Sequence, residues 1–263
     1  MIGFNALGQL GRLGNQMFQY AALKGIAANH GYNICIPKSR NQNEWTDHQL
    51  NSVFKMSTLT PLNYQYIDAN RPTIVEETFS FNERLFKTCP DWITLQGFFQ
   101  SEKYFKHIRD ELLTDFQFHD NILEPAKQVV SNWSKPIALH IRRTDYVTNS
   151  NHTVLPIEYY EQSLNMFDDD REVIIFSDDP EWCLNHTLFS SDRFMVSQTG
   201  SNALDLCLMS LCSAHIIANS SFSWWGAWIS NSQKVIAPVG WFKGSNNEHL
   251  DTQDLIPENW IVI

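Results

Sequence analysis

The stretch IALHIRRTDY, residues 137–146, joins a short apolar strand directly to a run of charged residues. A junction of an apolar strand with polar residues recurs in EVIIFSDD at 172–179 and in HIIANSS at 215–221. A further short strand is expected over 194–196 and a last one over 234–238, and helical patterns separate the strands, at 156–167, 204–213 and 222–230. Strands that alternate with helices predict a parallel sheet, so an α/β fold is expected.

The N-terminal part of the chain predicts a second unit of this kind. A strand is expected over 2–7, glycines follow at Gly8, Gly11 and Gly14, and a helical pattern begins at Asn15. Later elements are less regular, with a strand expected over 92–95 and helices over 101–113 and 120–133. The segment Ser134-Lys135-Pro136 is a plausible linker, which predicts two Rossmann-like domains, 1–134 and 135–263.

The composition excludes several classes of protein. With 43% hydrophobic and 18% charged residues, the 263-residue chain has enough apolar material for a core and is not disordered. Its net charge of −10, without a strongly basic stretch, argues against nucleic acid as a partner. No apolar run is long enough for a transmembrane helix, and no secretory signal opens the chain, so a cytoplasmic location is expected. Five irregularly spaced cysteines fit reduced thiols.

The candidate site lies where the strands end. In an open parallel sheet, ligands bind beyond the carboxyl ends of the strands, and polar clusters stand there at three successive strand ends. Arg142 and Arg143 suit a phosphate group, although a structural pair of Arg143 with Asp145 is an alternative. His140 shares a strand face with Arg142, and a packed strand residue is its simpler interpretation.

The two other clusters allow a ligand-binding and a structural interpretation each. Ser221 and Ser223 open a helix, where they either bind a phosphate oxygen or cap the helix. Asp178 either reads a hydroxyl or base, or belongs to a capping pair with Asp179, and no third carboxylate supports a metal there. The glycine spacing matches neither the dinucleotide-binding fingerprint nor the P-loop.

Five segments resemble the family 11 glycosyltransferases, which are mostly bacterial α-1,2-fucosyltransferases. In chain order they are GRLGNQMFQYA at 11–21, GFFQSEKYF at 97–105, HIRRTDY at 140–146, FSDD at 176–179 and SFSWWGAW at 221–228. The resemblance covers nearly the whole chain. It departs from the family pattern in the first glycine run, where Gln9, Leu10 and Arg12 are interposed.

The resemblance implies a GT-B-like fold, with two Rossmann-like domains whose parallel sheets face a cleft. Residues 1–134 would form the acceptor-side domain and 135–263 the domain that binds GDP-β-L-fucose. The implied reaction is inverting transfer of fucose to the 2-hydroxyl of a terminal galactose on an oligosaccharide. No metal or other cofactor is implied, in agreement with the missing D-x-D motif. Peripheral association with a membrane is compatible with this assignment.

The resemblance also assigns roles to residues. Arg142 would bind the diphosphate and stabilise the departing GDP, and Asp145 would act as a base or acceptor positioner, or orient an arginine. His140 would lie by the guanine or ribose, Asp205 would read guanine, and Ser221 and Ser223 would touch the β-phosphate. The full expected donor-binding set is Gly14, Asn15, Gln16, His140, Arg143, Asp178, Asp205, Ser220, Ser221 and Ser223. Alternatives are a fucosyltransferase of another linkage or acceptor, and a non-catalytic sugar-nucleotide-binding or lectin-like protein.

Overall fold

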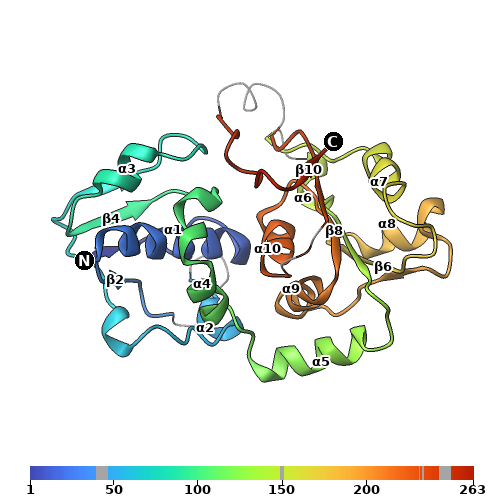
Figure 1. The fold of residues 1–263 in the computed structure, drawn as a ribbon, viewed down its shortest axis with the longest axis horizontal. Coiled ribbons are helices and arrows are strands. Elements are labelled where there is room, and N and C mark those ends of the chain that lie inside the picture. The colour runs from blue at the N-terminus through green and yellow to red at the C-terminus, as the bar shows by residue number, and fades with distance from the viewer. Residues whose placement is uncertain (40–46, 149–150, 231, 233, 243–249) are drawn as a thin grey trace. The chain divides into compact units, whose positions relative to one another are not determined.

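The computed structural model describes residues 1–39, 47–148, 151–230, 232, 234–242 and 250–263 (Figure 1). These residues form two compact units. Unit 1 comprises Met1–His119 with Leu250–Pro257, and unit 2 comprises Asp120–His249 with Glu258–Ile263. Each unit contains its own parallel sheet, as the alternation of strands and helices predicts.

Unit 1 is built on a four-stranded parallel sheet in the order β2-β1-β4-β3. The strands are short: β1 is Ile2–Gly3, β2 Ile34–Cys35, β3 Thr73–Val75 and β4 Ile93–Gln96. The long helix α1, Leu13–His30, is buried over most of its length and ends at Gly31, which takes the left-handed conformation. A Cβ at Gly25 would lie 2.1 Å from the Tyr104 carbonyl oxygen, so this close helix packing requires a glycine.

The remaining elements of unit 1 are short helices: α2 (Leu50–Val53), α3 (Glu83–Thr88) and α4 (Arg109–Asp115), with 3₁₀ turns at 61–63, 102–104 and 106–108. The prediction of a single helix over 101–113 is therefore wrong. Two 3₁₀ turns precede α4 because Tyr104 and Phe105 are both fully buried against other aromatic rings, and this packing overrides the helical pattern.

Unit 2 is built on a six-stranded parallel sheet in the order β10-β9-β8-β5-β6-β7. Its strands are β5 (Ile137–Ile141), β6 (Val173–Ser177), β7 (Phe194–Val196), β8 (Ala214–Ile216), β9 (Val235–Ala237) and β10 (Ile261–Val262). Its helices are α5 (Asp120–Val130), α6 (Thr144–Thr148), α7 (Ile157–Leu164), α8 (Pro180–Asn185), α9 (Asn202–Leu211) and α10 (Ser221–Ser230), with a 3₁₀ turn at 187–189. Every residue of the central strand β5 is buried, as its unbroken apolar run predicts.

The division between the units falls earlier than the predicted boundary after residue 134. Helix α5 belongs to unit 2, where it packs along α9 (Figure 1). The segment Leu250–Pro257 returns to unit 1, where Asp254 accepts a hydrogen bond from the Phe81 amide and pairs with Lys103 at 2.5 Å. Local composition does not show that a C-terminal segment packs against the N-terminal unit.

Among the described helices, none combines the length and the hydropathy that a membrane crossing needs. All five cysteines are buried with free thiols.

Candidate active site

Three polar loops meet at the carboxyl edge of the sheet in unit 2. Strand β5 lies between β6 and β8, so the loops after these strands are neighbours. The Asp178 carboxylate accepts hydrogen bonds from the amides of Arg143 at 2.9 Å and Thr144 at 3.2 Å. The Tyr146 hydroxyl donates to the Asn219 carbonyl at 3.1 Å. The sequence clusters at 142–145, 177–179 and 219–221 thus form one structural site.

Arg142 is one of two arginines at this edge. Its guanidinium donates to the Asp145 carboxylate at 2.8 Å, and its Nε lies 3.3 Å from the Asp178 carboxylate. The ring of Tyr146 lies 5.4 Å away. The Arg142 side chain keeps 19% of its surface exposed, so the charged group is held in place but still meets solvent. This arrangement suits a cation that binds an incoming anion.

Arg143 is held by different partners. Its Nε lies 3.2 Å from the Asp179 carboxylate, and its guanidinium stacks 4.0 Å from the centre of the Trp182 ring. The alternative pair of Arg143 with Asp145 is not formed, because Asp145 pairs with Arg142. The two consecutive arginines therefore have separate environments, and sequence reasoning missed Trp182 as a partner.

His140 lies in the interior, with 6% of its surface exposed. Its Nδ1 lies 2.8 Å from the Ser223 hydroxyl, which is itself buried at the start of α10. Burial, together with the charge of Arg142, lowers the pKa of His140 to about 3, so the ring is neutral at physiological pH. The packed interpretation of His140 matches this geometry, and contacts of His140 and Ser223 with the donor stay predictions.

The N-terminus of α10 stands at the same edge. Ser220 accepts a hydrogen bond from the Phe222 amide at 3.3 Å and so caps the helix, which begins at Ser221. Both serines are partly exposed. First-turn amides at a helix N-terminus have no acceptor within the helix, and the helix dipole favours an anion there.

Asp205 organises the loop after β7. One of its carboxylate oxygens accepts from the hydroxyls of Ser197 at 2.7 Å and Thr199 at 2.8 Å. Burial raises the pKa of Asp205, and the two hydroxyls oppose that shift. Its predicted contact with guanine is untested by this geometry.

The other expected donor-binding residues, Gly14, Asn15 and Gln16, lie in the first turn of α1 in unit 1. Gln16 is fully buried; its amide donates to the carbonyls of Gly11 and Asp47 at 3.3 and 3.4 Å and accepts from the Gln49 amide at 2.8 Å. Asn15 instead accepts a hydrogen bond from Gln100 at 2.9 Å. Gln16 thus supports the loop that precedes α1. Asn15 connects the first family motif, residues 11–21, to the second family motif, residues 97–105.

Within the part of the chain that the structure describes, no three His, Cys, Asp or Glu side chains gather closely enough to hold a metal ion. The charged groups of the site are instead arginines and carboxylates paired with one another.

The fold that this site occupies is shared with known fucosyltransferases. The chain is similar to fucosyltransferase NodZ from Bradyrhizobium, with a TM-score of 0.55 and 13% identity over 89% of this chain and 92% of that one. It is also similar to a mutant of Arabidopsis thaliana FUT1 in complex with GDP, with a TM-score of 0.58 and 11% identity over 94% of this chain and 71% of that one. These similarities show a GT-B-like α/β fold, as expected. The chain belongs to glycosyl transferase family 11, whose model matches residues 2–263.

Sequence relatives include enzymes that are named for different sugars, colitose and fucose. An α-1,2-colitosyltransferase of Escherichia coli is 30% identical over 96% of both chains. The O-antigen biosynthesis glycosyltransferase WbnK of Escherichia coli is 35% identical over 59% of this chain and 57% of its own length. The galactoside 2-α-L-fucosyltransferase SEC1 of Bos taurus is 29% identical over 86% of this chain and 64% of its own length. The chain is therefore a family 11 glycosyltransferase.

Proposed function

We propose that this enzyme transfers L-fucose from GDP-β-L-fucose, with inversion, to the 2-hydroxyl of a terminal galactose on a glycan. Unit 2 is the proposed GDP-fucose-binding unit, and unit 1 the proposed acceptor-side unit. The proposal rests on the position of Arg142, a partly exposed cation at the carboxyl edge of the sheet in unit 2. The N-terminus of α10 lies at the same edge. Relatives that act on galactosides in α-1,2 linkage support the acceptor and the linkage.

The chemical step requires charge stabilisation on the leaving group. The bond between fucose C1 and the β-phosphate oxygen breaks and leaves its electron pair on GDP. The acceptor oxygen bonds to C1 from the opposite face, and the hydroxyl proton passes to Asp145 or to water. A guanidinium and helix amides that are already in place stabilise the growing negative charge without having to reorganise. Arg142 and the N-terminus of α10 are the groups we assign to this task.

Two carboxylates hold Arg142 in place. Asp145 lies 2.8 Å from its guanidinium, and Asp178 lies 3.3 Å from its Nε. These contacts support a role for Asp145 in orienting Arg142. Because half of the Asp145 side chain is exposed, it also remains available to position an acceptor or take its proton. Metal independence is part of the proposal, since an arginine supplies the positive charge.

The decisive experiment is a transfer assay with GDP-fucose and a panel of galactosides, with the product linkage determined by NMR. The expected product carries fucose on the galactose 2-hydroxyl. A product of another linkage would replace the galactoside 2-fucosyl assignment while retaining fucosyl transfer. Binding of GDP-fucose without any turnover would instead support the non-catalytic alternative.

Colitosyl transfer is the second candidate, because the colitosyltransferase relative aligns over 96% of both chains. The two donors are compared directly by offering nucleotide-activated fucose and colitose with the same acceptor. A higher kcat/KM with the colitosyl donor would reverse the proposed preference.

A further inference from the structure

A carboxylate in unit 1 holds the loop that carries the second motif. Val75 of β3 pairs with Gln96 of β4, so the residues that follow the two strands are neighbours at the carboxyl edge of this sheet. There Glu76 accepts two backbone hydrogen bonds, from the Phe98 amide at 2.6 Å and the Phe99 amide at 2.8 Å. Each carboxylate oxygen takes one amide, so the side chain clamps the turn after β4.

The clamped turn has an unusual backbone. Gly97 has φ of +154°, and Phe99 takes the left-handed conformation with φ of +53°. A Cβ at Gly97 would lie 2.4 Å from Cβ of Glu76, so the approach of the two strand ends requires a glycine. A left-handed non-glycine residue is strained and persists only where surrounding contacts enforce it. The Glu76 carboxylate provides two of those contacts.

The turn leads directly to Asn15 of the first motif. Gln100 is 5% exposed, and its amide donates to the Asn15 side-chain oxygen at 2.9 Å. Gln100 Oε1 is buried without a hydrogen-bond partner among the described residues. Gln19 ties the same loops together, because its amide donates to the carbonyls of Gly97 at 3.1 Å and Leu10 at 2.9 Å. The two motifs, some 80 residues apart, thus form one hydrogen-bonded assembly.

We propose that Glu76 is a positioning residue of the transferase, which clamps the 97–100 loop and, through Gln100, sets the side-chain amide of Asn15 for the reaction. The inference rests on the proposed function for its catalytic consequence. The clamp itself is a property of unit 1 and is measured without substrate.

The pKa of Glu76 lies near neutral pH, so its ionisation can be followed in ordinary buffers. Burial raises its pKa to about 7, against the two amide hydrogen bonds, which favour the ionised form. The titratable group facing it is Tyr104, whose pKa is raised by burial and by the charges of Glu76 and Asp254. Lys103, in the same turn, pairs with Asp254. Protonation converts one of the two oxygens into a hydroxyl, which is a weaker acceptor for an amide, so the clamp should loosen as the pH falls through about 7.

Global stability responds to pH in the opposite direction, because unfolding moves the Glu76 carboxylate into water, whereas local opening of the turn leaves it buried and breaks only its two amide hydrogen bonds. Because the folded pKa lies above the unfolded value, the native state binds more protons than the unfolded state between about 4.5 and 7. The contribution of Glu76 to stability is therefore present at low pH and is lost as the pH rises through that window.

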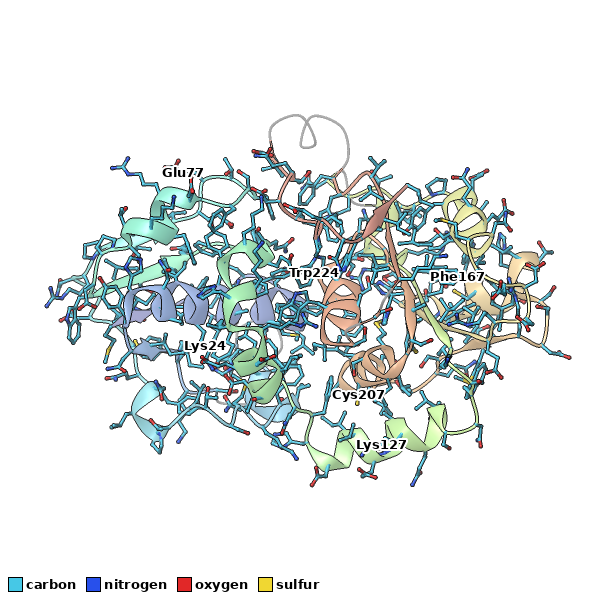
Figure 2. All side chains as sticks on the ribbon, in the orientation of Figure 1. Lys24, Glu77, Lys127, Phe167, Cys207 and Trp224 are labelled. Atoms are coloured by element: carbon cyan, nitrogen blue, oxygen red, sulfur yellow. The ribbon has the colours of Figure 1, made fainter. Side chains whose placement is uncertain are left out.

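The test compares Glu76→Gln with the control Glu77→Gln, whose side chain is exposed on the neighbouring position (Figure 2). Hydrogen exchange of the Phe98 and Phe99 amides, corrected for intrinsic rates, is followed by NMR in ligand-free protein between pH 5.5 and 8.5. Wild type and Glu77→Gln should gain protection about tenfold as the pH rises through the Glu76 pKa. Glu76→Gln should show low, pH-independent protection.

The catalytic readout is the pH profile of transfer. In wild type, kcat should fall below pH 7, and Glu76→Gln should lack this limb and lose about tenfold in kcat at pH 8, with a smaller change in donor KM. Gln100→Met should share the loss in kcat but keep the pH-dependent amide protection, which guards against a misfolded Glu76 variant. Wild-type protection and an unchanged pH profile in folded Glu76→Gln would overturn the proposal. If the Phe98 and Phe99 amides show pH-dependent protection but the enzyme transfers no fucose, the clamp is upheld and the proposed function is refuted.

Discussion

Arg142 and Arg143 are adjacent in sequence, yet their contacts predict different losses on substitution. Arg142→Lys keeps the charge but loses the planar fork that binds a phosphate through two hydrogen bonds. If the contact strengthens as charge develops on the leaving GDP, kcat should fall more than donor affinity, by about 3–4 kcal/mol or a hundred- to a thousandfold. Measurement of kcat and KM for GDP-fucose checks this.

Arg143→Lys is the matched control, because Arg143 is engaged with Asp179 and Trp182. Loss of its stacking should lower stability by about 0.5–1 kcal/mol and leave most of kcat intact. Near-wild-type turnover of a folded Arg142→Lys enzyme, or a larger kcat loss for Arg143→Lys, would refute the assignment.

At the scale of elements, a buried carboxylate joins α1 to α4. Asp115, which is fully buried, accepts from the Tyr20 hydroxyl and from Lys24 Nζ, both at 2.6 Å, and from the Thr58 amide at 2.7 Å. Asp115→Ala removes the buried partner of Lys24 and leaves only the exposed Glu111 carboxylate, 3.7 Å away, which should cost about 3–5 kcal/mol. Urea denaturation measures the loss.

Glu111 provides the control on the same helix. It also approaches Lys24, at 3.7 Å, but 59% of its side chain is exposed. Glu111→Ala should change stability by less than about 1 kcal/mol, since exposed ion pairs are screened by water. Equal losses in the two variants would show that burial does not decide the strength of this network.

For the whole molecule, the proposed donor predicts selective stabilisation by guanine nucleotides. GDP at about a hundred times its Kd should stabilise the folded enzyme by about 2.7 kcal/mol and raise its Tm, because it binds only the native state. UDP at the same concentration should have a much smaller effect. A larger shift with UDP in a thermal melt would contradict the guanine assignment.

The proposed mechanism also predicts that activity survives excess EDTA. The charge that the reaction needs is assigned to Arg142 and the start of α10, both part of the chain. Initial rates are compared before and after chelation. Loss of activity with recovery on addition of Mn²⁺ or Mg²⁺ would require a metal near the site and would contradict metal independence.

Local patterns were enough to find strands β5 to β9 of unit 2 and the loops that bear its site, although α6 and β10 were not predicted. The apolar run at 137–141 is fully buried in β5, and the strand expected over 194–196 is β7 with the same bounds. Parallel order then brings the ends of β5, β6 and β8 together, because carboxyl ends of parallel strands share one edge. Periodicity and strand order together therefore located the candidate site.

Side-chain partners depended on the tertiary structure. Asp145 pairs with Arg142, Arg143 stacks on Trp182, and Glu76 clamps amides more than twenty residues away. The exposed strand β3 and the 3₁₀ turns before α4 also carried no distinct local signal. Periodicity reports which face of an element is apolar, whereas hydrogen bonds and ring contacts depend on which distant segments the folded chain places within a few ångströms. The α/β class, the family motifs and the loops of the site could thus be predicted from local patterns, whereas packing sets the partner of each charged group.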